Sequence, residues 1–256
     1  MRRLSHIKLV NEFNEIFSDL FNIKSSTYKK MVLALANGPL AIKDLCKILH
    51  IEQSGFVSEC MEDLVDSGFI SRDYTWHISS GDVSKFSNFR LSDNYLRFYL
   101  KYIDKNKFKI DNDEFVFKSL TALPGWESIM GFQFENLVLK NRKLVKDYLG
   151  LKPEDIIADS PFFQRKTLRQ AGCQIDYLIQ TKFNTLYACE IKFAKSAITT
   201  SIITEMQNKL STLSYPKGFS IRPVLIHVNG VNTDVIESGF FAEIVDFGQF
   251  LVADSM

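Results

Sequence analysis

Apolar residues recur every three or four positions in four stretches near the start of the chain, a spacing that predicts amphipathic helices. These stretches are residues 11–21, 28–36, 40–49 and 54–67. Ser54 can cap the last of these helices by accepting a backbone hydrogen bond, and Gly68 ends it. Two extended segments follow, and the second ends near Leu91. Three helices and a two-stranded hairpin within residues 25–92 predict a winged helix-turn-helix domain.

The remainder of the chain alternates between helical spacing and short apolar strands. An aromatic-rich helical segment over residues 93–124 ends at Pro124 and Gly125, where we place a domain boundary. Beyond it the pattern predicts a helix over 125–149, strands near 156–158, 173–180 and 185–193, a helix over 198–213, and strands near 222–228 and 242–246. We therefore expect residues 125–256 to form an α/β domain with a mixed sheet, and the protein to be α+β overall.

Composition and charge limit the class of protein. Hydrophobic residues make up 46% of the 256 positions and charged residues 24%, which excludes a disordered or collagen-like chain. Lys and Arg number 31 against 30 Asp and Glu, so a nucleic-acid partner would need a local basic patch. The four cysteines lack Cys-x-x-Cys spacing, and no apolar stretch is long enough to cross a membrane. We expect free thiols, a cytoplasmic location and no membrane partner.

The residues best suited to chemistry lie on the two predicted strands 173–180 and 185–193. Glu190 and Lys192 are two positions apart, so they point to the same face of a strand, and a hairpin can bring Asp176 beside them. Two carboxylates at one end of a sheet can hold Mg²⁺ or Mn²⁺, and Lys192 can orient or deprotonate the attacking water. Glu135, on the predicted helix 125–149, is a candidate fourth member. The simpler alternative is that Glu190 and Lys192 pair with each other at a solvated strand end.

These residues resemble a known constellation. Glu135, Asp176 and Glu190-Ile191-Lys192 are similar to the motif of the PD-(D/E)xK nuclease-like superfamily, whose core is a helix and a mixed sheet with the acids and lysine at its open edge. Residues 91–98, Gly131-x-x-Phe134-Glu135 and Ile175-Asp176 also occur in the same order as in the C-terminal half of archaeal-type ATPases. In that family a winged helix and a nuclease-like domain of unknown function follow an AAA-type ATPase module.

The resemblance implies a metal-dependent phosphodiesterase directed at DNA, or a catalytically silent relative. Asp176 and Glu190 would bind the metal, Lys192 would position water, and Glu135 would complete the site. Residues 1–24 would correspond to the end of an ATPase lid. No Gly-x-x-x-x-Gly-Lys-Ser/Thr sequence occurs, so we expect no ATPase activity from this chain, which would be a truncated or split ATPase or a pair of domains that works alone. The alternative function is a non-enzymatic module that binds DNA or a partner ATPase. A third hypothesis is a regulatory scaffold in which the acidic third helix and the aromatic segment form a homodimer face.

The basic residues point to a DNA surface away from the predicted winged helix. Its third predicted helix, residues 54–67, has four acidic residues and no lysine or arginine, which favours protein contact over base readout. Basic residues gather instead on the helix 125–149 and before the Asp176 strand. They are Lys140, Arg142, Lys143, Lys146, Arg165, Lys166 and Arg169. They form either a clamp on the phosphate backbone beside the metal site or a solvated surface.

Overall fold

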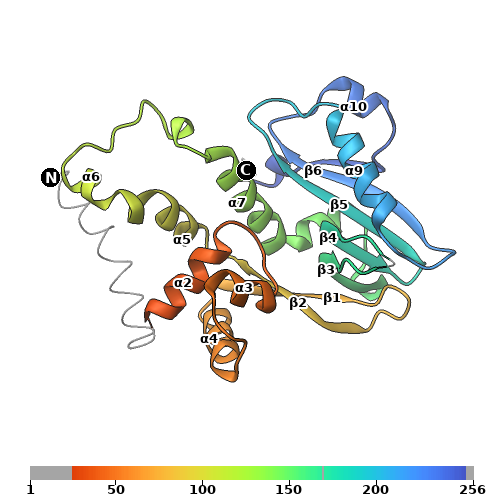
Figure 1. The fold of residues 1–256 in the computed structure, drawn as a ribbon. Helices are drawn as coiled ribbons and strands as arrows, with labels where there is room; N and C mark the ends of the chain where they lie inside the picture. Colours follow the sequence, from red (N-terminus) through yellow and green to blue (C-terminus); the bar gives the residue numbers. More distant parts are fainter. Residues whose placement is uncertain (1–24, 169, 252–256) are drawn as a thin grey trace. The chain divides into compact units, whose positions relative to one another are not determined.

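The computed structural model describes residues 25–168 and 170–251, which divide into two compact units (Figure 1). The first unit contains residues 25–72 and 88–129, and the second contains residues 73–87 and 130–251. The helix predicted over residues 11–21, and with it the segment that resembles an ATPase lid, lies outside the described residues. Each unit has its own hydrophobic core.

The first unit begins with three helices and the base of a hairpin, in the order that the sequence predicts. The elements are α2 (Ser25–Leu35), α3 (Ile42–Leu49), α4 (Gly55–Asp66), β1 (Ile70–Trp76) and β2 (Val83–Leu91). Ser54 caps α4 by accepting a hydrogen bond from the Val57 N–H, at 3.4 Å. Gly68, at a φ of 76°, then turns the chain toward β1 in a conformation that favours glycine. The assignment of this unit as a winged helix stays a prediction.

The aromatic segment that follows is only partly helical. It contains α5 (Asn94–Phe98), a π-helical turn (Tyr99–Ile103), a 3₁₀ turn (Asp104–Asn106), α6 (Lys107–Asp111) and a second 3₁₀ turn (Leu120–Ala122). Arg97 lies almost fully buried and donates hydrogen bonds to the carbonyls of Ala36 and Leu91, both at 2.7 Å. Residues 112–119 form no helix, because the chain turns at Asp113, whose φ is 60°. The connecting segment predicted over 93–124 is thus helical from residue 94 to 111, and again at 120–122, but not between them.

The second unit is a mixed sheet with helices on both faces, which confirms the predicted α/β class. Its elements are α7 (Trp126–Lys140, beginning in the first unit), α8 (Arg142–Tyr148), β3 (Ile156–Gln164), β4 (Cys173–Thr181), β5 (Thr185–Phe193), α9 (Ser201–Thr212), β6 (Ser220–Val228), α10 (Thr233–Glu237) and β7 (Glu243–Asp246), with 3₁₀ turns at Pro153–Asp155 and Phe247–Phe250. The strand order is β3-β4-β5-β6-β7. The β3, β4 and β5 strands pair antiparallel, whereas β5, β6 and β7 pair parallel.

The predicted single helix over 125–149 is two helices, α7 and α8, separated at Asn141. The Asn141 side-chain amide donates a hydrogen bond to the Leu137 carbonyl, at 2.7 Å. An asparagine whose side chain bonds the backbone in this way competes with continued helix. Val138 before the break and Val145 after it pack in the same core.

Each face of the sheet buries a different core. Helices α7 and α8 cover one face, where Val138 and Val145 pack with Tyr177. Helix α9 covers the other face, where Ile202 and Met206 pack on the sheet (Figure 1). The core in which a β4 or β5 side chain packs therefore shows on which face of the sheet that side chain lies.

A β-bulge interrupts the alternation of β4. Ser160 pairs with Leu178 and Phe162 pairs with Ile175, so two residues of β4, Asp176 and Tyr177, lie opposite the single Pro161 of β3. Proline has no N–H to donate, so the β-ladder is already interrupted at this position. As a consequence Ile175 and Leu178, three residues apart, both face the α9 side of the sheet. Bulges of this kind re-aim side chains near functional sites.

The tip of the hairpin (residues 73–87) belongs to the second unit. The Trp76 indole N–H donates to Gln180 Oε1, at 2.6 Å, and the Gln180 amide donates to the Ile78 carbonyl, at 2.9 Å. The Trp76 ring also meets Phe162 edge-on, with ring centroids 5.1 Å apart. The tip is thereby fixed to β3 and β4 by both polar and aromatic contacts.

Within the described residues, every helix is too short or too polar to cross a membrane.

Candidate functional site

Two of the predicted acidic residues, Asp176 and Glu190, come together where β4 and β5 separate; we call them the acid pair. The regular antiparallel register ends at Tyr177 and Cys189, one step before them. The Ile191 N–H then donates to the Asp176 carboxylate, at 3.0 Å, in place of a backbone carbonyl. Asp176 is fixed by this bond at the end of the ladder, next to the strand that bears Glu190.

Lys209 of α9 contacts the acid pair from the face of the sheet that α9 covers. Its ammonium donates to Glu190 Oε2 and lies 3.4 Å from Asp176 Oδ1. Sequence reasoning missed this residue, although a signal was present. Ile202, Met206 and Leu213 form a buried stripe along the helix, and Lys209 falls on that stripe. A lysine on an apolar stripe needs a partner inside the protein, and the acid pair is that partner.

Burial gives the acid pair unusual electrostatics. Glu190 is only 4% exposed, and burial, helped by the charge of Asp176, raises its pKa to about 7 against the opposing effects of Lys209 and Lys192. Burial lowers the pKa of Lys209, but the charges of Asp176 and Glu190 outweigh that effect and raise its pKa above the ordinary value. The lysine therefore stays charged, and Glu190 titrates near neutral pH.

Lys192 has a different partner from the one that the simpler alternative assumed. Its ammonium pairs with Glu205 of α9, at 2.8 Å, while Glu190 is bonded to Lys209. The side chains of Lys192 and Glu205 are 38% and 47% exposed, so this ion pair lies at the rim of the site. Glu135 lies half-buried on α7, and its contribution to the site stays a prediction.

The acid pair offers the oxygen donors that a hard divalent cation prefers, but two carboxylates by themselves do not fill its coordination shell. Among the described residues, no three His, Cys, Asp or Glu side chains gather closely enough to hold a metal ion. Magnesium is often bound through one or two carboxylates, with water completing its shell, so two converging carboxylates fit it. The Lys209 ammonium bonds both carboxylates, so a cation bound to both would have to compete with it.

The predicted basic residues on α8 make hydrogen bonds and ion pairs within the protein, on the face of the sheet opposite to α9. Arg142 donates to the carbonyls of Leu139, at 2.9 Å, and Asp159, at 3.0 Å. Lys146 pairs with the Asp159 carboxylate, at 2.9 Å. Because α8 and α9 cover opposite faces, these side chains do not lie beside the acid pair.

The other predicted basic residues are more exposed. Lys143 forms an exposed ion pair with Asp147, at 2.7 Å, one turn along α8, and Lys140 is exposed at the end of α7. Arg165 and Lys166 lie exposed in the loop after β3, whereas Arg169 is outside the described residues. DNA contact by any of these residues stays a prediction.

Comparison with known proteins gives only distant likenesses. No protein-family model matches the sequence, and no curated protein is significantly similar to it. A repair endonuclease from Pyrococcus abyssi is 16% identical over 44% of each chain, with a TM-score of 0.30. Protein VC1899 from Vibrio cholerae is 13% identical over 93% of this chain, with a TM-score of 0.35. The chain spans 44% and 50% of the lengths of these two proteins. At these scores neither likeness establishes a shared function, and membership of the ATPase family stays a prediction.

Proposed function

We propose that the second unit is a metal-dependent phosphodiesterase that acts on DNA, with Asp176 and Glu190 as ligands of Mg²⁺ or Mn²⁺. The observation that supports this function best is the convergence of two largely buried carboxylates on one ammonium group at the point where β4 and β5 part. Burying such charges costs free energy that an apolar cluster would avoid, which is typical of a site kept for function. The sequence resemblance to PD-(D/E)xK nucleases points the same way.

The residues of the site have distinct roles in this proposal. A divalent cation held by the acid pair would lower the pKa of a bound water and offset the charge that develops on the phosphate. Lys209, released from between the carboxylates, would orient water or a phosphate oxygen. Lys192 at the rim would contact the DNA backbone or position water, and Glu135 would complete the metal site, as the sequence suggests.

Thermal unfolding with and without Mn²⁺ or Mg²⁺ tests the metal site. We expect the metal to raise the unfolding temperature of the wild type by several degrees and that of Glu190→Gln by much less, because binding to the folded state alone stabilises it. Glu205→Gln is the matched control, because Glu205 is an exposed glutamate on the same face that bonds Lys192 rather than the acid pair. It should keep the full shift.

Cleavage of labelled DNA by the same three proteins then tests the activity. Wild type and Glu205→Gln should cleave in the presence of Mn²⁺, and Glu190→Gln should not. The proposal would be ruled out if the wild type cleaves no DNA and if the metal leaves its unfolding temperature unchanged, both with and without DNA.

The second candidate is a non-enzymatic module that binds DNA or a partner ATPase. Its support is Lys209, whose ammonium already pairs with both carboxylates without a metal. Lys209→Met separates the two candidates. If the site is built for a cation, this variant should be destabilised without metal and rescued by Mn²⁺ more strongly than the wild type. If the lysine has replaced the metal for good, Mn²⁺ should leave Lys209→Met as unstable as before.

A further inference from the structure

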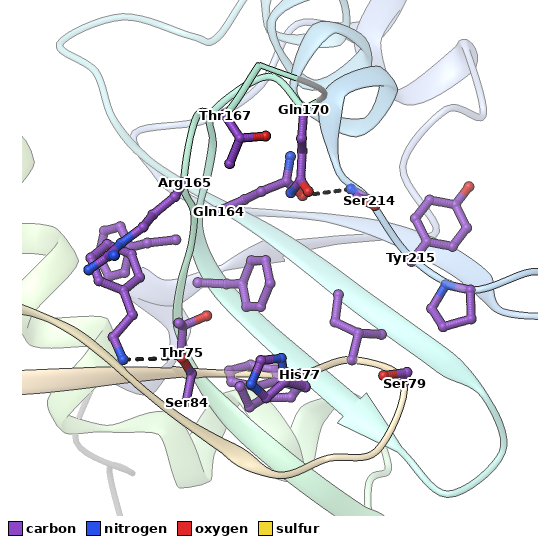
Figure 2. A pocket seen from close by; sticks show the side chains of 16 residues that line it. Thr75, His77, Ser79, Ser84, Gln164, Arg165, Thr167, Gln170, Ser214 and Tyr215 are labelled. Carbon is purple, nitrogen blue, oxygen red and sulfur yellow. Dashed lines mark hydrogen bonds between the residues drawn. The ribbon is translucent and has the colours of Figure 1, made fainter.

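A groove opens in the second unit next to the end of α9 (Figure 2). Its volume is about 600 Å³, and its walls are the hairpin tip, the end of β3 with the loop that follows, and the segment after α9. Trp76, Phe86, Gln164, Arg165, Ser214 and Tyr215 are among the residues that line it. None of these residues belongs to the acid pair.

The walls of the groove are tied to one another by Gln164. Its side-chain amide donates to the carbonyls of Ala171 and Thr212, both at 2.7 Å, and its carbonyl accepts from the Ser214 N–H, also at 2.7 Å (Figure 2). One side chain thus joins the loop after β3 to the end of α9. A groove with walls fixed in this way needs little reordering to accept a ligand.

Helix α9 connects the groove to the acid pair. Lys209, whose ammonium bonds both carboxylates, lies on the last turn of the helix, one turn before Leu213 and Ser214. The Cys173 thiol donates to the Lys209 carbonyl, at 3.3 Å, and fixes that turn to the start of β4. A chain lying in the groove would therefore lead toward the acid pair.

The chemistry of the lining favours an anionic ligand with flat rings. The Arg165 guanidinium lies over the Phe86 ring, 3.9 Å from its centroid, and both side chains reach the groove. Tyr215 is 42% exposed and presents another ring. Although the chain has 30 acidic residues, none of those lining the groove is an aspartate or a glutamate. A phosphate group would meet no like charge there.

We infer that this groove binds an unpaired strand of DNA, with bases against the exposed rings and a phosphate near Arg165. The inference rests on the proposed function, because it supplies the substrate strand to the acid pair. An unpaired base exposes its faces to aromatic side chains without the unstacking that a duplex requires, and such stacking tolerates any sequence. The groove volume also lies within the ~300–1,000 Å³ of pockets for small molecules, which suits a nucleotide rather than a duplex.

Fluorescence anisotropy with a labelled oligothymidine of about twelve nucleotides, within the range of known single-strand site sizes, tests the groove directly. The titration is done in EDTA, so that no metal contributes. Arg165→Gln and Tyr215→Ala should each weaken binding on the order of fivefold or more, as loss of a stacking or phosphate contact does. A duplex of the same length should bind more weakly than the single strand.

Arg222→Gln is the matched control. Arg222 is exposed and also lies over an aromatic ring, that of Tyr187 at 5.9 Å, but it does not line the groove. Its replacement should leave the affinity unchanged. Equal weakening by Arg222→Gln, no weakening by either groove variant, or tighter binding of the duplex would each overturn the inference.

Binding and cleavage separate this inference from the proposed function. Glu190→Gln should bind the oligonucleotide as the wild type does in EDTA. Groove-dependent binding without any metal-dependent cleavage would refute the nuclease and keep the groove. Cleavage by a wild type whose binding ignores Arg165 and Tyr215 would refute the groove and keep the nuclease.

Discussion

Glu190 is subject to two opposing influences that set its charge. Burial and Asp176 favour its neutral form, whereas Lys209 and Lys192 favour its ionised form, and burial has the largest effect. Its carboxylate can therefore gain or lose a proton close to pH 7, where most surface glutamates remain ionised. The folding free energy should depend on that proton.

The raised pKa predicts a loss of stability as the pH rises. A group with a higher pKa in the folded state favours folding fully below its ordinary pKa of 4.5, and that contribution is lost as the pH passes about 7. We expect the wild type to lose about 2 kcal/mol more between pH 5 and pH 8 than Glu190→Gln does. Urea unfolding in EDTA at both pH values measures this, and equal losses in the two proteins would contradict it.

At this scale the sequence predicted the acid pair but not its full surroundings. Asp176 and Glu190 were identified because a hairpin brings their strands together, which local pattern determines. Lys209 was missed because its contact depends on how α9 lies across the sheet, which neighbouring residues do not reveal. Lys192 was predicted on the correct strand, but its partner Glu205 also comes from α9.

Among the elements, the hairpin shows how one buried hydrogen bond can decide where a segment packs. Trp76 is 5% exposed and Gln180 is 2% exposed, so the bond between them is closed to water.

Most strands and helices of the second unit were predicted near their observed limits. The packing of the hairpin tip with that unit depends on contacts between residues about a hundred positions apart, which the local pattern does not contain.

Removal of the Trp76 N–H should destabilise the protein although the ring remains aromatic. Trp76→Phe leaves the buried Gln180 oxygen without its donor, which typically costs about 1–3 kcal/mol. Trp126→Phe, a half-buried tryptophan in the first unit, is the control for the change in ring size. Urea unfolding compares the two variants, and equal stabilities would show that the indole bond contributes nothing.

At the scale of the whole molecule, the two units share one hairpin. Each strand of it runs from residues that belong to the first unit into residues that belong to the second. The sequence predicted two successive domains, and nothing in its local pattern indicated that one hairpin would be divided between them. Because the strands are continuous, unfolding of one end should disturb the pairing at the other.

This shared hairpin predicts a single unfolding transition. In Trp126→Phe the remaining tryptophan, Trp76, reports on the second unit by fluorescence, while far-ultraviolet circular dichroism reports on all helices and strands. We expect both signals to change at the same urea concentration, as in two-state unfolding. A loss of helical signal at lower urea, with Trp76 fluorescence unchanged, would show that the units unfold independently. The circular-dichroism midpoint of the wild type checks that the substitution itself is mild.

The bulge in β4 has a consequence for insertions and deletions. Substitutions at Asp176 or Tyr177 exchange one side chain for another, but the deletion of either residue would restore regular alternation opposite Pro161. Ile175 and Leu178 would then be two positions apart and would still share their core, but the residue left between them would point to the opposite face of the sheet. A deletion of Tyr177 should thus keep the core but carry Asp176 away from Lys209 and Glu190, so relatives of this chain that use the acid pair should keep the length of this strand even where other side chains differ.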